Sequence, residues 1–115
     1  MPNEIVVLVT CPAAHSNMLA STLVEERLCA CVNIVPSITS VYIWEKKLSR
    51  EPEELLIVKT NLSQWEALKA RIRELHSYTL PEIICLPILN GYKPYLDWIN
   101  ATVGSNDAGE QVTSD

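Results

Sequence analysis

Residues 4–11 read EIVVLVTC, a nearly continuous run of β-branched and other apolar side chains. Such a run is typical of a strand that is covered on both faces, because alternate side chains point to opposite sides and neither set here is mainly polar. We therefore expect Glu4–Cys11 to be a central strand of a sheet, with the rest of the chain built around it.

Helical spacing of apolar residues occurs in three segments downstream. Residues 13–28 and 61–76 each predict an amphipathic helix, with charged residues on the side away from the apolar stripe. Ser63 and Glu66 have the spacing of a capping box near the start of the second helix. Residues 94–100 predict a short third helix close to the end of the chain.

The segments between the helices are rich in β-branched residues and predict three further strands. Residues 31–44 form one long strand with a bend at Pro36, which cannot donate a ladder hydrogen bond. The polar residues 45–52 predict the tip of a hairpin, and residues 54–60 predict the returning strand. Residues 82–89 predict the last strand, which should lie at an edge or be kinked because it contains a proline.

The predicted order is strand, helix, strand, strand, helix, strand. This order is that of the α+β, ferredoxin-like βαββαβ sandwich, an antiparallel sheet with both helices on one face, here followed by the short C-terminal helix. The other face of the sheet is left bare although its strands are apolar. An apolar surface of that extent marks a partner surface, so we expect the chain to associate with copies of itself.

Composition sets the size and the class of the protein. The 115 residues, 48% of them hydrophobic, suffice for one domain, which we place at residues 1–102, and residues 103–115 have the composition of a disordered acidic tail. A net charge of -5 argues against a nucleic-acid partner. No apolar run is long enough to cross a membrane, so no membrane partner is expected. Four cysteines without a secretory leader indicate a reducing, cytoplasmic location.

The stretch LCACVN, residues 28–33, places Cys29 and Cys31 two residues apart. On a strand both thiols would point to one side, where they could hold a soft ion such as copper(I). Alternatively the sulfur atoms fill the core, because free cysteine is among the most buried residue types. The sequence has no second pair at metal-site spacing, which favours the core interpretation. Cys85, inside an apolar strand, is also expected in the core.

Several motifs resemble those of the CutA family, the divalent-cation tolerance proteins. The resemblance covers roughly residues 4–100 in order and includes CACVN (29–33), YIWEKK (42–47), IVKT (57–60), HSYTLPEI (76–83) and YLDW (95–98). It implies a ferredoxin-like homotrimer whose sheets pack edge to edge around a threefold axis, similar to the PII signalling proteins. The family is linked to copper and other divalent metals and, in animals, to the anchoring of a membrane enzyme.

Metal-binding members of the family have a histidine that is similar to His76. Their accompanying thiol and second histidine correspond to Val9 and Leu75 here, so the resemblance implies weak binding of copper or another divalent metal. Cys11, two residues beyond Val9, is a candidate substitute for the thiol. Alternatively, His76 satisfies the last carbonyl groups of its helix. His15 is interpreted as a polar surface residue.

Five residues of the family motifs are candidates for a ligand cleft near a neighbouring subunit: Tyr42, Trp44, Lys59, Tyr78 and Glu82. The alternative, which we favour at this point, is that the aromatic residues are interface anchors. Lys59 lies on an apolar strand, so a carboxylate such as that of Glu82 is expected beside it.

The sequence contains no recognised catalytic motif. It has none of the common nucleotide-binding, metalloprotease or hydrolase motifs, and its three glycines offer little for a phosphate cradle. We therefore expect a non-enzymatic protein with no required cofactor, which binds divalent metal weakly or binds a small ligand and serves metal tolerance or signalling. The alternatives are a scaffold that anchors another protein and an enzyme that uses His76, Lys59 and Glu82.

Overall fold

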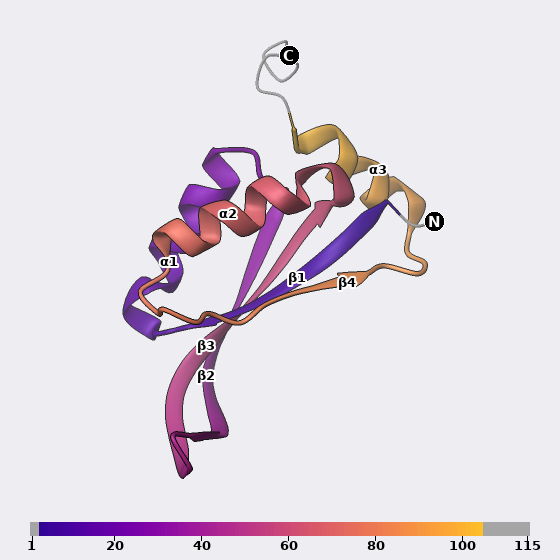
Figure 1. Cartoon of the computed structure of the whole chain (residues 1–115). Helices are drawn as coiled ribbons and strands as arrows, with labels where there is room; N and C mark the ends of the chain where they lie inside the picture. Colours follow the sequence, from indigo (N-terminus) through magenta and orange to yellow (C-terminus); the bar gives the residue numbers. More distant parts are fainter. Residues whose placement is uncertain (1–2, 105–115) are drawn as a thin grey trace.

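The computed structural model describes residues 3–104 and contains a four-stranded antiparallel sheet (Figure 1). Its strand order is β2-β3-β1-β4, so β1 is central, as predicted. Both neighbours of β1 run antiparallel to it. The strands are β1 (Glu4–Cys11), β2 (Cys31–Trp44), β3 (Lys47–Asn61) and β4 (Ile83–Pro87).

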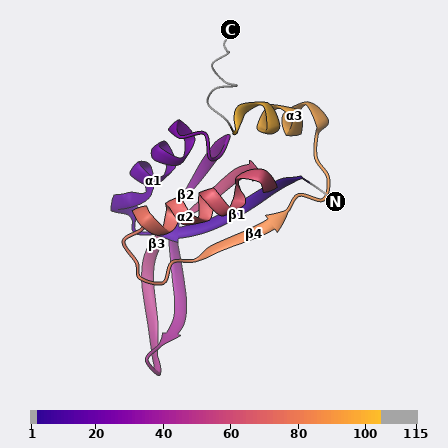
Figure 2. The same ribbon diagram turned by 45° about the horizontal axis from the view of Figure 1, so that its top comes forward.

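Helices α1 (Ala13–Glu25) and α2 (Trp65–Leu75) lie side by side on one face of the sheet (Figures 1 and 2). A third helix, α3 (Lys93–Thr102), lies at the end of the sheet where β1 begins, and Asn100 Nδ2 donates a 2.6 Å hydrogen bond to Glu4 Oε2. The element order and the placement of both helices confirm the predicted α+β, ferredoxin-like fold.

The core lies between the sheet and helices α1 and α2. Alternate residues of β1 face the helices and are almost completely buried, whereas the residues between them are only half-buried. Burial of each large aliphatic side chain in such a core contributes about 1.5–3 kcal/mol to stability. The fully buried members from other elements include Leu19 and Leu23 of α1, Leu56 and Val58 of β3, and Leu68 and Ile72 of α2.

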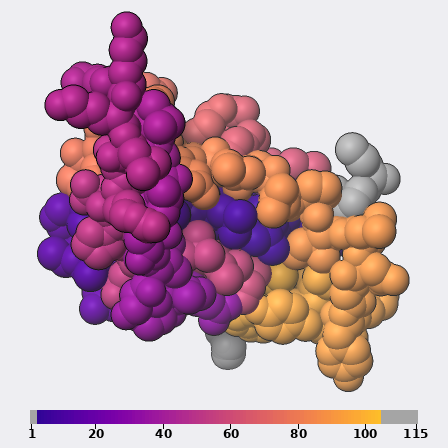
Figure 3. Space-filling view, turned by 90° about the horizontal axis from the view of Figure 1, so that it is seen from below, coloured from indigo at the N-terminus to yellow at the C-terminus, as the bar shows by residue number. Residues whose placement is uncertain are grey.

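Among residues 3–104, no element covers the face of the sheet opposite the helices (Figure 2). Figure 3 shows it from below, with β1 visible between β4 and the strands of the β2–β3 hairpin. Ile84 and Leu86 of β4 point to this face, in register with Leu8 and Val6, and both are more than 40% exposed. A single chain thus covers only one of the two apolar faces of EIVVLVTC, and we call the other the open face.

Strands β2 and β3 continue beyond the sheet as a long two-stranded hairpin, residues 38–53, which we call the arm (Figures 1 and 2). Pairing extends to Trp44 and Lys47, and only Glu45 and Lys46 form the turn. Both turn residues have positive φ, 50° and 68°, as two-residue hairpin turns of type I′ require. The prediction of a polar tip over residues 45–52 is therefore wrong beyond Lys46, because polar side chains are compatible with a strand that water surrounds.

The bend predicted at Pro36 is confirmed. The β2–β3 register shifts between Val35 and Ile38, and Ser37 has a φ of 61°. One strand therefore carries extra residues here, which is a β-bulge and turns the arm relative to the sheet.

Three predicted boundaries are corrected by local backbone geometry. Helix α1 ends at Glu25 instead of residue 28, because Arg27 adopts a left-handed φ of 62°. The capping box does not form: Ser63 lies in a short 3₁₀ turn, η1 (Leu62–Gln64), and its hydroxyl donates to Asn61 Oδ1. Helix α2 consequently begins at Trp65, and β4 is shorter than predicted by one residue at its start and two at its end.

The predicted acidic tail falls almost entirely outside the described residues. Of the predicted tail, only Val103 and Gly104 are among the described residues. Their backbone N–H groups donate to Ile99 O and Arg27 O, respectively. Among residues 3–104, none of the helices combines the length and the hydropathy that a membrane crossing requires.

Truncation of the core should destabilise the fold, whereas truncation of the adjacent exposed residue should not. Leu19 is 0% exposed and Met18 is 42% exposed in the same helix. We expect Leu19→Ala to lower the free energy of unfolding by about 2–5 kcal/mol and Met18→Ala to change it by less than about 1 kcal/mol. Chemical denaturation followed by circular dichroism measures both, and equal losses would contradict the assignment of the core.

Candidate functional site

An open pocket of about 950 Å³ lies where the arm leaves the sheet. Four of the five predicted cleft residues line it, namely Tyr42, Trp44, Tyr78 and Glu82. The other lining residues are Thr10 at the end of β1, Ser40, Val41 and Ile43 of β2, Glu51 and Glu53 of β3, and Ser77, Thr79 and Leu80 of the loop between α2 and β4.

The strand geometry explains why the arm contributes its aromatic and acidic residues together. Ser40, Tyr42 and Trp44 share one face of β2, because side chains alternate along a strand. Ser40 is directly opposite Glu51 on β3. The pairing of Ile38 with Glu53 brings a second carboxylate to the same face, and Ser40 Oγ donates a 2.5 Å hydrogen bond to Glu53 Oε1.

Glu53 connects the arm to the loop that precedes β4. It is 8% exposed, and its second carboxylate oxygen accepts a 2.8 Å hydrogen bond from the hydroxyl of Tyr78. Burial, together with the negative charge of Glu53, raises the pKa of Tyr78. The phenol therefore keeps its proton and acts as a donor to the carboxylate.

The lining of the pocket is strongly one-sided in charge. It contains the carboxyl groups of Glu51, Glu53 and Glu82, and none of its lining residues within the described part of the chain is a lysine, arginine or histidine. Burial raises the pKa of Glu82, and the nearby charge of Glu53 raises it further. The ionised form of Glu82 is thus disfavoured in the folded chain relative to water.

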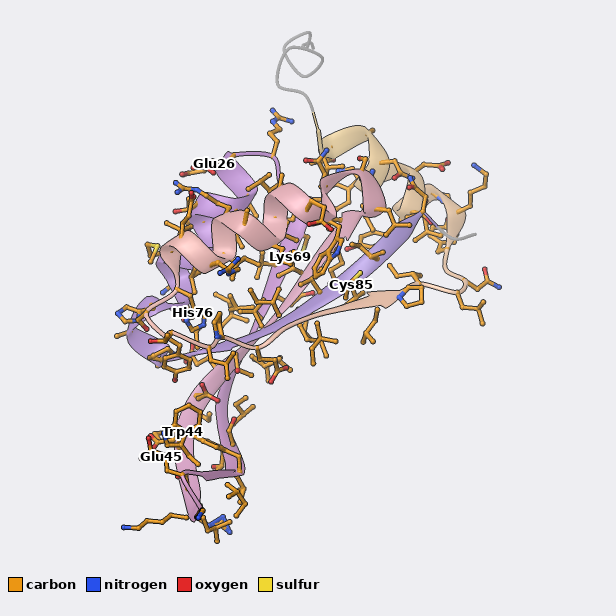
Figure 4. All side chains as sticks on the ribbon, viewed as in Figure 1. Glu26, Trp44, Glu45, Lys69, His76 and Cys85 are labelled. Atoms are coloured by element: carbon orange, nitrogen blue, oxygen red, sulfur yellow. The ribbon has the colours of Figure 1, made fainter. Side chains whose placement is uncertain are left out.

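His76 lies at the end of α2, directly before the loop residues Ser77 and Tyr78 (Figure 4). Its Nε2 donates a 2.8 Å hydrogen bond to Thr10 O, and its Nδ1 accepts a 3.0 Å hydrogen bond from the N–H of Tyr78. These two partners define the neutral imidazole with its proton on Nε2. The ring therefore ties the end of β1 to the loop and positions Tyr78, while its only lone pair is already used.

Lys59 does not join the other cleft candidates. It is paired with Val6 in the body of the sheet, and its Nζ donates to Asn33 Oδ1 instead of to Glu82. The expected carboxylate partner is absent from the ion pairs found within residues 3–104. Lys59 is half-buried on the open face, where a long aliphatic stem can carry the ammonium group to water and a carboxylate is not required.

The cysteines are all free thiols. Cys29 is fully buried just before β2 and belongs to the core, as the core interpretation of LCACVN expects, whereas Cys31 and Cys85 are half-buried. Burial, together with the charges of Glu54 and Glu53, raises the pKa of Cys11 to about 11. Across residues 3–104, no three His, Cys, Asp or Glu side chains are grouped so that they could hold one metal ion.

Two features of the site were not found by sequence reasoning. Glu51 and Glu53 reach the pocket through the pairing of β2 with β3, which depends on the register past the bulge. His15 is half-buried instead of simply solvated, and its Nδ1 lies 3.1 Å from Ser77 Oγ, which joins α1 to the loop. Only the alternation of residues within the arm could have indicated the acidic pair.

The fold and the site together define a ferredoxin-like domain with a protruding β-hairpin and an acidic, aromatic pocket at the base of that hairpin. The chain belongs to the CutA1 divalent ion tolerance protein family, whose family model matches residues 5–102.

Relatives and solved structures agree with this assignment. The divalent-cation tolerance protein CutA of Thermus thermophilus is 48% identical over 102 residues, which are 88% of this chain and 99% of that protein. Protein CutA, chloroplastic, of Arabidopsis thaliana is 49% identical over 84% of this chain, which spans only 53% of the plant protein. The crystal structure of CutA1 from Oryza sativa has a TM-score of 0.87 at 44% identity and covers 90% of this chain and 96% of its own.

Removal of the Glu82 charge should stabilise the fold at neutral pH. A carboxyl group whose pKa is raised above its ordinary value of 4.5 binds its proton more tightly in the folded chain, so its ionisation costs stability as the pH rises. We expect Glu82→Gln to raise Tm at about pH 7 and to have little effect at about pH 3.5, where the parent carboxyl is protonated. Scanning calorimetry at both values measures the difference.

The control for this prediction is Glu25→Gln, which makes the same change of charge at the exposed end of α1. An increase in Tm no larger than that of the control would show that the environment of Glu82 does not penalise its charge.

Proposed function

We propose that this chain is a self-associating binding protein that holds a small ligand in the pocket at the base of the arm and in this way serves divalent-cation tolerance. The observation that carries the proposal is the convergence of Tyr42, Trp44, Tyr78 and Glu82 at one pocket. Aromatic walls with a few placed polar groups are the usual composition of a small-molecule site. The hydrogen bonds of Glu53 and His76 hold the pocket together before any ligand arrives.

Self-association is supported by the two surfaces that one chain leaves exposed. The open face presents Ile84 and Leu86, and the arm presents Ile43 and Leu48, all of them large apolar side chains. Edge-to-edge packing of three copies, as the family resemblance implies, would cover both surfaces and would also remove the free edges of the sheet. In such a trimer the pocket lies beside a neighbouring copy.

We propose that metal binding by a single copy is weak. The names of the relatives link the family to divalent cations, but His76 would have to give up its hydrogen bond from Tyr78 to coordinate a metal. Cys11 is buried and its thiolate is disfavoured. Since metal ligands must be deprotonated and accessible, these residues do not fit a tight copper site. We propose a cytoplasmic location for the chain because four free thiols suit a reducing compartment.

Binding at the pocket should depend on Trp44. We expect a thermal-shift screen of small molecules of mixed charge to find compounds that raise Tm with concentration, and we expect Trp44→Ala to abolish their effect. Tyr92→Ala, which removes an exposed aromatic ring far from the pocket, should leave it unchanged. If no compound acts, or if every active compound acts equally on Trp44→Ala, the pocket is not a ligand site. Copper(II), tested in a separate titration, should show no saturable effect on Tm at micromolar concentration.

Association should depend on the open face. We expect sedimentation velocity to give three times the mass of one chain at micromolar concentration. We expect Leu86→Arg to reduce that mass, since it places a charge within the apolar surface, while Met18→Arg on the helical face should not. A parent protein that sediments as a single chain would refute the proposed assembly.

A further inference from the structure

We infer that the ligand of the pocket at the base of the arm is a small organic cation, in which an ammonium group is attached to an apolar body. This inference rests on the proposed function and names the class of ligand that the same site would take. It is carried by three observations: the negative charge of the pocket, the burial of Glu53 with only neutral hydrogen-bond donors, and the position of the aromatic rings.

Three carboxyl groups from two segments face the same space, and no cationic side chain of residues 3–104 lines that space. Glu51 and Glu53 come from β3, and Glu82 comes from the residue before β4. A ligand that enters this space without positive charge leaves the mutual repulsion of the three groups in place. A ligand with positive charge relieves it, and it gains more than it would in water because the surroundings are partly desolvated.

Glu53 gives the most specific indication of a missing cation. Glu53 as a whole residue is more than nine-tenths buried, yet both hydrogen-bond donors to its carboxylate, Ser40 and Tyr78, are neutral hydroxyl groups. A buried carboxylate is normally compensated by a paired charge in addition to hydrogen bonds. None of the ion pairs found within residues 3–104 includes Glu53. An ammonium group in the adjoining pocket would supply that charge.

The aromatic rings favour an organic cation over a metal ion. Tyr42, Trp44 and Tyr78 line the pocket, and the rings of Tyr42 and Trp44 remain about half exposed. An ammonium or methylated ammonium group over such a ring is attracted by the negative face of the π-system, and the attraction is stronger where water is partly excluded. Aromatic carbon offers nothing to the first coordination sphere of Mg²⁺ or Ca²⁺, which take oxygen ligands. The volume of about 950 Å³ also exceeds by far what a single ion occupies.

A matched series of probes separates charge from shape. Benzylammonium, benzyl alcohol and benzoate share one ring and nearly the same size but carry charges of +1, 0 and -1. We expect isothermal titration calorimetry of the full chain, at neutral pH and low salt, to show that benzylammonium binds at least about tenfold more tightly than benzyl alcohol. Benzoate should show no measurable binding, because the three carboxyl groups repel it.

Two variants of equal charge test the location of the binding site. Glu82→Gln removes one pocket carboxylate that has no hydrogen-bond partner among the described contacts, and it should weaken benzylammonium binding several-fold while leaving benzyl alcohol unchanged. Glu25→Gln makes the same change of net charge on α1, outside the pocket, and should leave all three probes unchanged.

The outcomes distinguish this inference from the proposed function. If the three probes bind with equal affinity and Trp44→Ala abolishes their binding, the pocket is a ligand site without preference for cations, and the inference is overturned while the proposed function stands. If benzylammonium does not bind, or if Glu82→Gln and Glu25→Gln weaken it equally, the pocket carboxylates do not recognise a cation and the inference is also overturned. If the thermal-shift screen finds no ligand at all, both fall together.

Discussion

The central strand of this protein is apolar on both of its faces, and the elements formed by residues 3–104 cover only one of them. Helices α1 and α2 of the same chain cover the buried set, which consists of Ile5, Val7, Val9 and Cys11. Within residues 3–104 no helix covers the opposite set, because α3 lies at the end of the sheet and not across it (Figure 2). The exposed apolar surface and the proposal of self-association both depend on this one-sided coverage of the strand.

The arm determines the chemistry of the site. By continuing the pairing of β2 and β3 as far as Trp44 and Lys47, the chain places aromatic and acidic side chains on one surface of a two-stranded ribbon. The bulge after Val35 sets the direction in which the ribbon leaves the sheet. The loop between α2 and β4 then supplies Tyr78 and Glu82, and the carboxylate of Glu53 joins loop and ribbon through neutral donors. The result is a negative, aromatic pocket with no basic side chain among its described lining residues.

Most of the fold could be predicted from the spacing of apolar residues. The continuous apolar run EIVVLVTC matches a buried strand, and the apolar residues of the two long helices recur at helical spacing. The errors occur where pairing across strands overrides local composition. The polar residues 47–52 are strand because their partners on β2 hold them there, and Ser63 forms a 3₁₀ turn because Asn61 competes for its hydroxyl. The aromatic half of the site could be identified from motifs, but Glu53 and Ser77 could not, since their positions depend on register and on loop closure. Lys59 was misassigned because its long stem allows a half-buried lysine to avoid a carboxylate partner.

The ring of His76 fastens a segment that has no regular secondary structure of its own. Between α2 and β4 the backbone is held to the end of β1 through Thr10, and to α1 through the contact of His15 with Ser77. Residues 76 to 78 are each fixed to a different element, because the hydroxyl of Tyr78 also donates to Glu53 of β3. Unlike most surface loops, which tolerate insertions, this one therefore has a fixed spacing at its start, and natural variation within residues 76–78 should appear as changes of side chain and not as changes in the number of residues.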